Sequence, residues 1–165
     1  MSRRSKSLIA VEVKDLVQCR PTAAFVGASW AALALGATLF LFGLWNAPTL
    51  ALSEKGFYFC VLLLGLYAAV SLQKSLRDRE EGLPVSALYH NISWAMLGMS
   101  AFLMLVGLWN AALALSEKGF YGIAFAMSLF AVITIQKNTR DTRQIEALLR
   151  QAPYHDDGMP ASEDV

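Results

Sequence analysis

Four long stretches of this chain contain no charged side chain, and they predict its architecture. No Asp, Glu, Lys or Arg occurs in residues 21–53, 56–73, 82–116 or 119–136. Each stretch can hold a helix that crosses the hydrocarbon core of a bilayer, which takes about 17 to 25 residues. The pattern therefore predicts four spanning helices, at residues 22–45, 56–72, 92–109 and 119–135.

Two sequence motifs also occur twice along the chain. Gly-Leu-Trp-Asn-Ala at 43–47 returns at 107–111, and Ser-Glu-Lys-Gly-Phe-Tyr at 53–58 returns at 116–121. Aligned this way, 27 of 49 positions are identical, and Pro48 has no counterpart. Each copy of such a repeat is one supersecondary unit. We therefore predict an all-α membrane protein whose four transmembrane helices form two tandem parallel-repeat helical hairpins.

Lys and Arg predict how the helices are oriented, because cationic segments beside a span stay on the cytoplasmic side. The segment before the first span carries five of them, the middle loop three and the segment after the last span four, whereas each loop inside a copy carries one. Both termini and the middle loop should therefore be cytoplasmic. Both copies then share one orientation, which relates them by a pseudo-twofold axis along the membrane normal.

The repeat and the charges together predict the domain organisation. A cytoplasmic N-terminal segment covers residues 1–21, the first two-helix repeat covers 22–79, and a cytoplasmic linker covers 80–91. The second two-helix repeat covers 92–141. A cytoplasmic helix extension and a disordered acidic tail cover 142–165.

Composition narrows the class of protein further. With 56% hydrophobic residues and a mean hydropathy of +0.44, the chain is too apolar for an ordinary soluble domain. The net charge of +1 and the lack of a long basic run argue against nucleic acid as a partner. The bilayer is the expected partner, together with a second copy of the chain or another membrane protein.

The repeated residues at the outer ends of the hairpins have two interpretations. In the structural one, the two Trp sit at the headgroup level, each Asn stops a helix by a left-handed turn or by capping its last carbonyls, and Ser53 and Ser116 are N-caps. Gly56 and Gly119 then permit close helix approach. In the functional one, both copies form one outward-facing polar site. This candidate outer-face motif comprises Trp45, Asn46, Ser53, Glu54, Lys55, Trp109, Asn110, Ser116, Glu117 and Lys118.

A second repeated set lies at the inner ends of the spans. These residues can be snorkelling cations with local ion pairs, in which Arg77 could reach an acid of the other copy such as Asp141. Alternatively, they form a docking surface for a partner. This candidate inner-face motif comprises Gln73, Lys74, Arg77, Asp78, Gln136, Lys137, Arg140 and Asp141.

The sequence offers no catalytic constellation, so we expect a protein that is not an enzyme. No carboxylate, Lys or Arg lies deep in a predicted span, and such a residue is the usual mark of an ion path. His90 and His155 have no neighbours for a metal site, and no nucleophile is paired with a base. We therefore predict no catalytic residue, no metal and no cofactor.

In order and length, the repeated motifs resemble the YiaA/YiaB family of bacterial inner-membrane proteins, most closely the YiaA type with two copies of the two-helix domain. The resemblance covers about residues 29–141. It implies a multi-pass protein of the bacterial inner membrane with four spans, and it supplies no mechanism. The expected function is a non-enzymatic structural or interaction role. The alternative is a facilitator or channel for a small solute that uses the repeated outer-face polar motifs.

Overall fold

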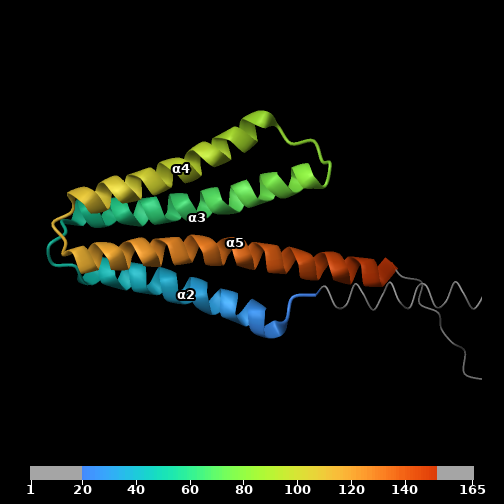
Figure 1. Ribbon diagram of the computed structural model, residues 1–165, viewed down its shortest axis with the longest axis horizontal. Coiled ribbons are helices and arrows are strands. Elements are labelled where there is room, and N and C mark those ends of the chain that lie inside the picture. Colours follow the sequence, from blue (N-terminus) through green and yellow to red (C-terminus); the bar gives the residue numbers. More distant parts are fainter. Residues whose placement is uncertain (1–19, 152–165) are drawn as a thin grey trace, which may run out of the picture. The chain divides into compact units, whose positions relative to one another are not determined.

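The computed structural model describes residues 20–151, with side chains described as far as residue 147. Most of the predicted N-terminal segment and the end of the predicted acidic tail lie outside these residues. The described chain forms four helices, α2 (Ala23–Asn46), α3 (Leu52–Glu80), α4 (Ala87–Asn110) and α5 (Leu115–Gln151) (Figure 1). All four are long and apolar enough to cross a membrane. The predicted all-α class and the four helices are confirmed.

Helices α3 and α5 are longer than the predicted spans at both ends. Each begins four residues before the predicted start, and each continues through its Gln-Lys and Arg-Asp residues. The spans were delimited by their apolar residues, but Lys, Arg, Gln and Glu are themselves good helix formers. The helical backbone therefore runs on through the polar ends.

The chain divides into two compact units. The larger one covers residues 22–139 and contains the four-helix bundle. In the described part of the other unit, the Arg20 guanidinium lies 3.3 Å from the Glu146 carboxylate, and both side chains are about half exposed. An exposed pair of this kind contributes little to stability.

Within the bundle, each copy packs its first helix against the second helix of the other copy. Helix α2 lies beside α5, and α3 lies beside α4 (Figure 1). A Cβ atom on Gly36 of α2 would be 2.7 Å from Ser128 Oγ of α5, and one on Gly65 of α3 would be 2.6 Å from Ser100 Oγ of α4. The closest contacts between helices therefore join the two copies.

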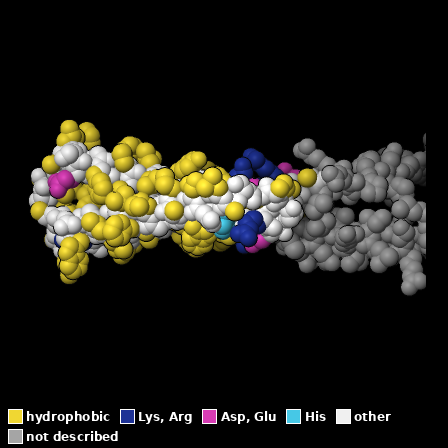
Figure 2. Space-filling view, turned by 90° about the horizontal axis from the view of Figure 1, so that it is seen from above, with side chains coloured by type: hydrophobic (Ala, Val, Ile, Leu, Met, Phe, Trp, Pro, Cys, Tyr) yellow, Lys and Arg dark blue, Asp and Glu magenta, His cyan; other side chains and the backbone are white. Residues whose placement is uncertain are grey.

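Helices α2 and α4 each bury a narrow stripe of residues at equivalent positions. Both α2 and α4 bury four residues at successive spacings of seven, four and four, namely Ser29, Gly36, Phe40 and Leu44, and Ser93, Ser100, Met104 and Leu108. Most of their remaining apolar side chains, such as Phe42 and Leu105, are exposed. Figure 2 shows the resulting hydrophobic face, with charged side chains toward its ends. Such a face suits lipid, which solvates apolar side chains as well as a protein core does.

We name the two ends of the bundle by their connections. The hairpin end contains the α2–α3 and α4–α5 connections at residues 47–51 and 111–114, and the linker end contains the α3–α4 connection at residues 81–86. At the linker end, Gly82 has a φ of +71°, which stops α3. The amide of Leu83 then donates to the Asp78 carbonyl at 2.9 Å. This left-handed residue is where glycine is favoured.

Candidate functional site

The same three hydrogen bonds occur at the hairpin end of each copy. In the first copy, Lys55 Nζ of α3 donates to the Trp45 carbonyl of α2 at 2.8 Å, which joins the two helices. Asn46 Nδ2 donates to the Phe42 carbonyl one turn earlier in α2 at 2.8 Å, and Glu54 Oε2 accepts the Ala51 amide at the start of α3 at 2.7 Å. The Trp45 carbonyl and the Ala51 amide have no partner within the helices, so two of these bonds satisfy groups at helix ends.

The second copy repeats this arrangement. The Lys118 ammonium donates to the Trp109 carbonyl at 3.1 Å, and the Asn110 amide donates to the Val106 carbonyl at 2.8 Å. The Glu117 carboxylate accepts the Ala114 amide at 2.8 Å. Three of the repeated residue types therefore have structural work at the hairpin end in both copies.

The predicted N-caps are wrong. Helix α3 begins at Leu52 with Ala51 as its N-cap, so Ser53 is the second helical residue, and Ser116 is likewise the second residue of α5. A glutamate three residues after the cap binds the cap amide, which supplies half of a capping box without a hydroxyl at the cap. The two serines are instead exposed.

The backbone conformation decides between the two predicted roles of the asparagines. Among the described residues, no residue other than glycine has a positive φ. Asn46 and Asn110 therefore do not adopt the left-handed conformation, and their side chains bond carbonyls of the preceding turn.

The glycines predicted to permit close helix approach are also the wrong ones. Nothing lies within 4 Å of a Cβ built on Gly56 or Gly119. At the hairpin end the close approaches are made by Gly43 and Gly107, where a Cβ would be 3.1 Å from a ring carbon of Phe120 and 2.8 Å from one of Phe57. Both glycines belong to the first helix of one copy, and both rings belong to the second helix of the other.

Two matching pockets lie at this end of the bundle, each between the two copies. The first pocket has a volume of about 370 Å³ and is lined by Gly43, Asn46, Ala47, Pro48, Ser116, Glu117, Phe120 and Tyr121. The second pocket has a volume of about 320 Å³ and is lined by Ser53, Glu54, Phe57, Tyr58, Gly107, Asn110 and Ala111. The sequence predicted one polar site made by both copies, and the structure instead has two pockets that each combine residues of both copies.

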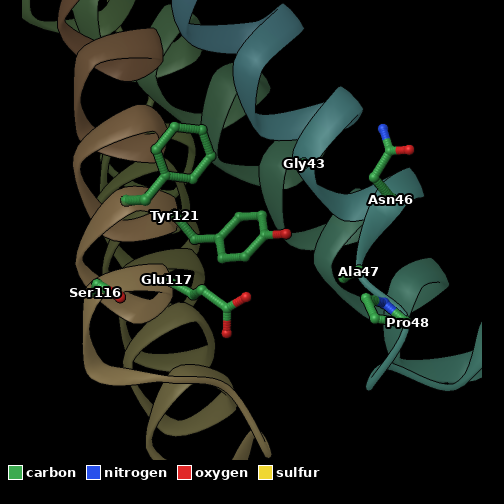
Figure 3. A pocket seen from close by; sticks show the side chains of 8 residues that line it. Gly43, Asn46, Ala47, Pro48, Ser116, Glu117 and Tyr121 are labelled. Atoms are coloured by element: carbon green, nitrogen blue, oxygen red, sulfur yellow. The ribbon is translucent and has the colours of Figure 1, made fainter.

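Few of the polar side chains in the first pocket face its interior. Figure 3 shows the Glu117 carboxylate and the Tyr121 hydroxyl directed into the space between α5 and α2. Asn46 is directed away from it, and Ser116 lies on the far side of α5. The polar chemistry of the pocket is therefore one carboxylate and one phenol.

The rings beside the two carboxylates have the same geometry in both pockets. Phe120 and Tyr121 meet edge to face with ring centroids 5.5 Å apart, and Phe57 and Tyr58 do so at 5.4 Å. Both tyrosine rings are buried, with exposed fractions of 6% and 4%. Edge-to-face pairs fix ring orientation, so each pocket has a rigid aromatic wall.

Trp45 and Trp109 do not line the pockets. They are 80% and 86% exposed. Each directly precedes a pocket-lining asparagine, and tryptophan gathers at membrane interfaces.

The candidate inner-face motif is only partly brought together. The Arg77 guanidinium pairs with the carboxylate of its neighbour Asp78, with Nε 2.9 Å from Oδ1, and its Nε is 4.0 Å from Glu81. Arg77 is thus paired within its own copy. Lys74 and Lys137 are exposed, whereas Gln73 and Gln136 are half-buried. Arg140 and Asp141 lie in the other unit and are half-buried there.

The linker end also contains buried polar contacts that the sequence analysis missed. Asn138 Nδ2 donates to Ser29 Oγ at 3.2 Å, which joins α5 to α2, and Ser75 Oγ is 3.1 Å from His90 Nδ1, which joins α3 to α4. Serine and asparagine at the edge of an apolar span are a signal for such bonds. In the part of the chain that the structure describes, no three His, Cys, Asp or Glu side chains form a group that could hold a metal ion.

Comparisons with known proteins agree with this duplicated architecture. The family model for the yiaA/B two helix domain matches residues 25–78 and again 89–141. The chain is 52% identical over 118 residues to the inner membrane protein YiaA of Escherichia coli K12, covering 72% of this chain and 81% of that protein. It is 40% identical over 62 residues to the uncharacterized membrane protein YubF of Bacillus subtilis 168, covering 38% of this chain and 71% of that protein. No solved structure matches.

Proposed function

The chain belongs to the yiaA/B two helix domain family of membrane proteins, and on that premise we propose that it is a non-enzymatic structural or interaction protein of the bacterial inner membrane. One observation carries this proposal. At the hairpin end, the recurring Lys side chain bonds the end of the preceding helix, and the recurring Asn and Glu side chains bond the backbone at the helix ends, in the same way in both copies. A motif retained for this purpose builds a rigid scaffold without requiring a reaction.

The linker end supplies the surface for an interaction. Lys74, Arg79 and Lys137 are exposed there, while Arg77 is held by Asp78. Figure 2 shows Lys and Arg side chains gathered beside the hydrophobic face at this end. Exposed cations next to an apolar face suit an acidic segment of another membrane protein.

We place both termini and the linker on the cytoplasmic side. The support is the twelve Lys and Arg residues toward the termini and the linker against the two, Lys55 and Lys118, at the hairpin end. Reporter fusions to the N-terminus, to the C-terminus and within residues 47–51 test this orientation. The two terminal fusions should be active as cytoplasmic reporters and the loop fusion as a periplasmic one, and the reverse pattern would refute it.

The interaction is tested by gentle purification of the full chain from its own membrane, with chemical cross-linking and mass spectrometry. We expect a stoichiometric partner, cross-linked near the linker end, that is lost from Lys74→Ala with Lys137→Ala. Ser53→Ala with Ser116→Ala is the matched control, because it changes two exposed residues at the opposite end. Partners that are retained equally by both variants would remove the linker end as the docking surface.

A facilitator for a small solute is the alternative function. The side chains that the sequence assigned to its lining, Asn46, Asn110, Ser53 and Ser116, are exposed and are divided between two pockets. Solute flux in proteoliposomes that is abolished by Asn46→Leu with Asn110→Leu would favour this alternative over the scaffold.

A further inference from the structure

The two pockets at the hairpin end combine the capping glutamates with aromatic groups that closing the hairpins does not use. Each is a cavity at the lower end of the size range of small-molecule sites, about 300 to 1,000 Å³. Each also combines one carboxylate, one phenol and a pair of fixed rings. Closing a hairpin requires no such cavity between the copies.

The carboxylate and the rings select a cation. Glu117 Oε2 is occupied by the Ala114 amide, which leaves Oε1 for the pocket into which the carboxylate points (Figure 3). Phe120 and Tyr121 line the same pocket, and the face of an aromatic ring attracts a cation. A single carboxylate beside aromatic rings suits an organic ammonium group, whereas a divalent metal takes six or more oxygen ligands.

A lysine is held one residue away from the lining of each pocket. Lys55 Nζ bonds the carbonyl of Trp45, the residue before the pocket-lining Asn46, and this bond uses one of its three donors. Lys118 bonds the carbonyl of Trp109, the residue before the pocket-lining Asn110, in the same way. Each pocket is therefore lined by one glutamate, and an ammonium group is held next to one of its lining residues along the chain.

We propose that each pocket binds a phosphoethanolamine group, with the ammonium against Glu117 or Glu54 and the phosphate at Lys55 or Lys118. Each exposed tryptophan directly precedes a pocket-lining residue, and tryptophan gathers at the depth of lipid headgroups, so an aminophospholipid is one source of the group. A free phosphoethanolamine ester is the other source. This site goes beyond the proposed scaffold function and does not depend on the linker end.

The test is native mass spectrometry of the full chain in mild detergent, with equal amounts of phosphatidylethanolamine and phosphatidylglycerol of the same acyl chains. We expect two phosphatidylethanolamine molecules per chain to be retained in preference to phosphatidylglycerol. Glu54→Gln with Glu117→Gln should reduce that retention about tenfold, because it removes the charge but leaves an oxygen to accept the cap amide. Asp78→Asn, which removes a carboxylate at the linker end, should leave retention unchanged.

Glycerophosphoethanolamine distinguishes the two sources. If a millimolar excess displaces the lipid, the pockets bind the headgroup alone, and a soluble ester is a sufficient ligand. If the lipid stays bound, acyl chains on the hydrophobic face contribute, and the lipid is the ligand.

Two results would overturn the proposal. One is equal retention of the two lipids by the unaltered chain, and the other is a preference that survives the double glutamine substitution. If that variant is not a monodisperse helical protein, Lys55→Gln with Lys118→Gln carries the test, since glutamine can still donate to the tryptophan carbonyls. It should lower phosphatidylethanolamine retention while Lys74→Gln with Lys137→Gln does not, and equal retention by these two variants would refute the site.

Discussion

The two seams between the copies, α2 with α5 and α3 with α4, are the same at the hairpin end and different at the linker end. At the hairpin end, Gly43 meets Phe120 in one seam as Gly107 meets Phe57 in the other. At the linker end, an asparagine bonds a serine in one seam, whereas a serine bonds a histidine in the other. The contacts at the hairpin end are therefore common to both seams, whereas the contacts at the linker end differ between the seams.

The middle of the bundle shows how the seams tolerate change. In the α2–α5 seam the small residue is Gly36 on the first helix, facing Ser128. In the α3–α4 seam the glycine, Gly65, is on the second helix and faces Ser100. Each seam thus holds one glycine and one serine, in opposite places. The combined volume has been kept where the individual residues have not, as close packing requires.

Exchanging this pair gives the largest effect and tests that comparison most directly. Gly36→Ser places a serine against Ser128, which is fully buried, and should lower the free energy of unfolding by about 2 kcal/mol through overpacking. Adding Ser128→Gly reproduces the order found in the other seam and should restore stability to within about 0.5 kcal/mol, since neighbouring residues couple this strongly. Unfolding in mixed detergent micelles, followed by circular dichroism, measures both.

Ser128→Gly alone is the control for the exchange. It removes the bond from Ser128 Oγ to the Ala124 carbonyl and places a glycine inside a helix, so it should cost about 1 kcal/mol. A double variant that loses the sum of the two single effects would show that the seams are not equivalent at this level.

Much of this fold is contained in the sequence, but the choice of helix partners is not. The charge-free stretches predict four helices because a bilayer admits few other structures. The repeat predicts two equivalent hairpins, yet a seam within a hairpin and a seam between copies would both bury one stripe of small residues. The close approaches at Gly36 and Gly65 decide between them, and they depend on a neighbour that the sequence does not place.

The sequence predicted only part of the candidate site, for a related reason. The repeated glutamates and lysines identified the hairpin end as a candidate site. Glu54, three residues after Ala51, caps the start of α3, although Ser53 was the predicted N-cap. Tyr58 and Tyr121 belong to the repeated motifs. They were not predicted as site residues, because an aromatic residue in a span usually packs in the core. Only the pairing of the copies turns these rings toward a pocket.

The glycines at the hairpin end give the next largest effect. Gly107→Ala should cost about 1 kcal/mol, because its Cβ would be 2.8 Å from a Phe57 ring carbon, and Gly43→Ala should cost less because its nearest ring carbon is 3.1 Å away. The melting temperature in detergent measures both variants.

Gly56→Ala and Gly119→Ala are the matched controls for these substitutions. They lie in open space near the starts of α3 and α5 and should be neutral or stabilising by about 0.5 kcal/mol. If all four substitutions had the same effect, the proposed equivalence of the two hairpin-end contacts would have no basis in packing.

The linker end gives the smallest effect, and the hydrogen bonds there explain why. Ser75 Oγ donates to the Leu72 carbonyl at 3.0 Å as well as lying 3.1 Å from His90 Nδ1. Replacing His90 by valine, the residue at the equivalent position 26 of the first copy, leaves the serine hydroxyl satisfied. The loss should be about 0.6 kcal/mol, the mean value for a hydrogen bond between membrane helices.

Adding Ser75→Asn to His90→Val would give the α3–α4 seam the pattern of the α2–α5 seam, with an asparagine facing Ser93 as Asn138 faces Ser29. The double variant should regain the stability that His90→Val loses, and Ser93→Ala should then remove that gain. The same unfolding assay measures the series.

If Ser75→Asn adds a further loss, the backbones at the linker end differ as well as the side chains, and the equivalence of the seams stops at the middle of the bundle. If stability returns, the histidine is a substitution that the second seam accommodates, and an asymmetric role for this end must rest on the exposed cations around it.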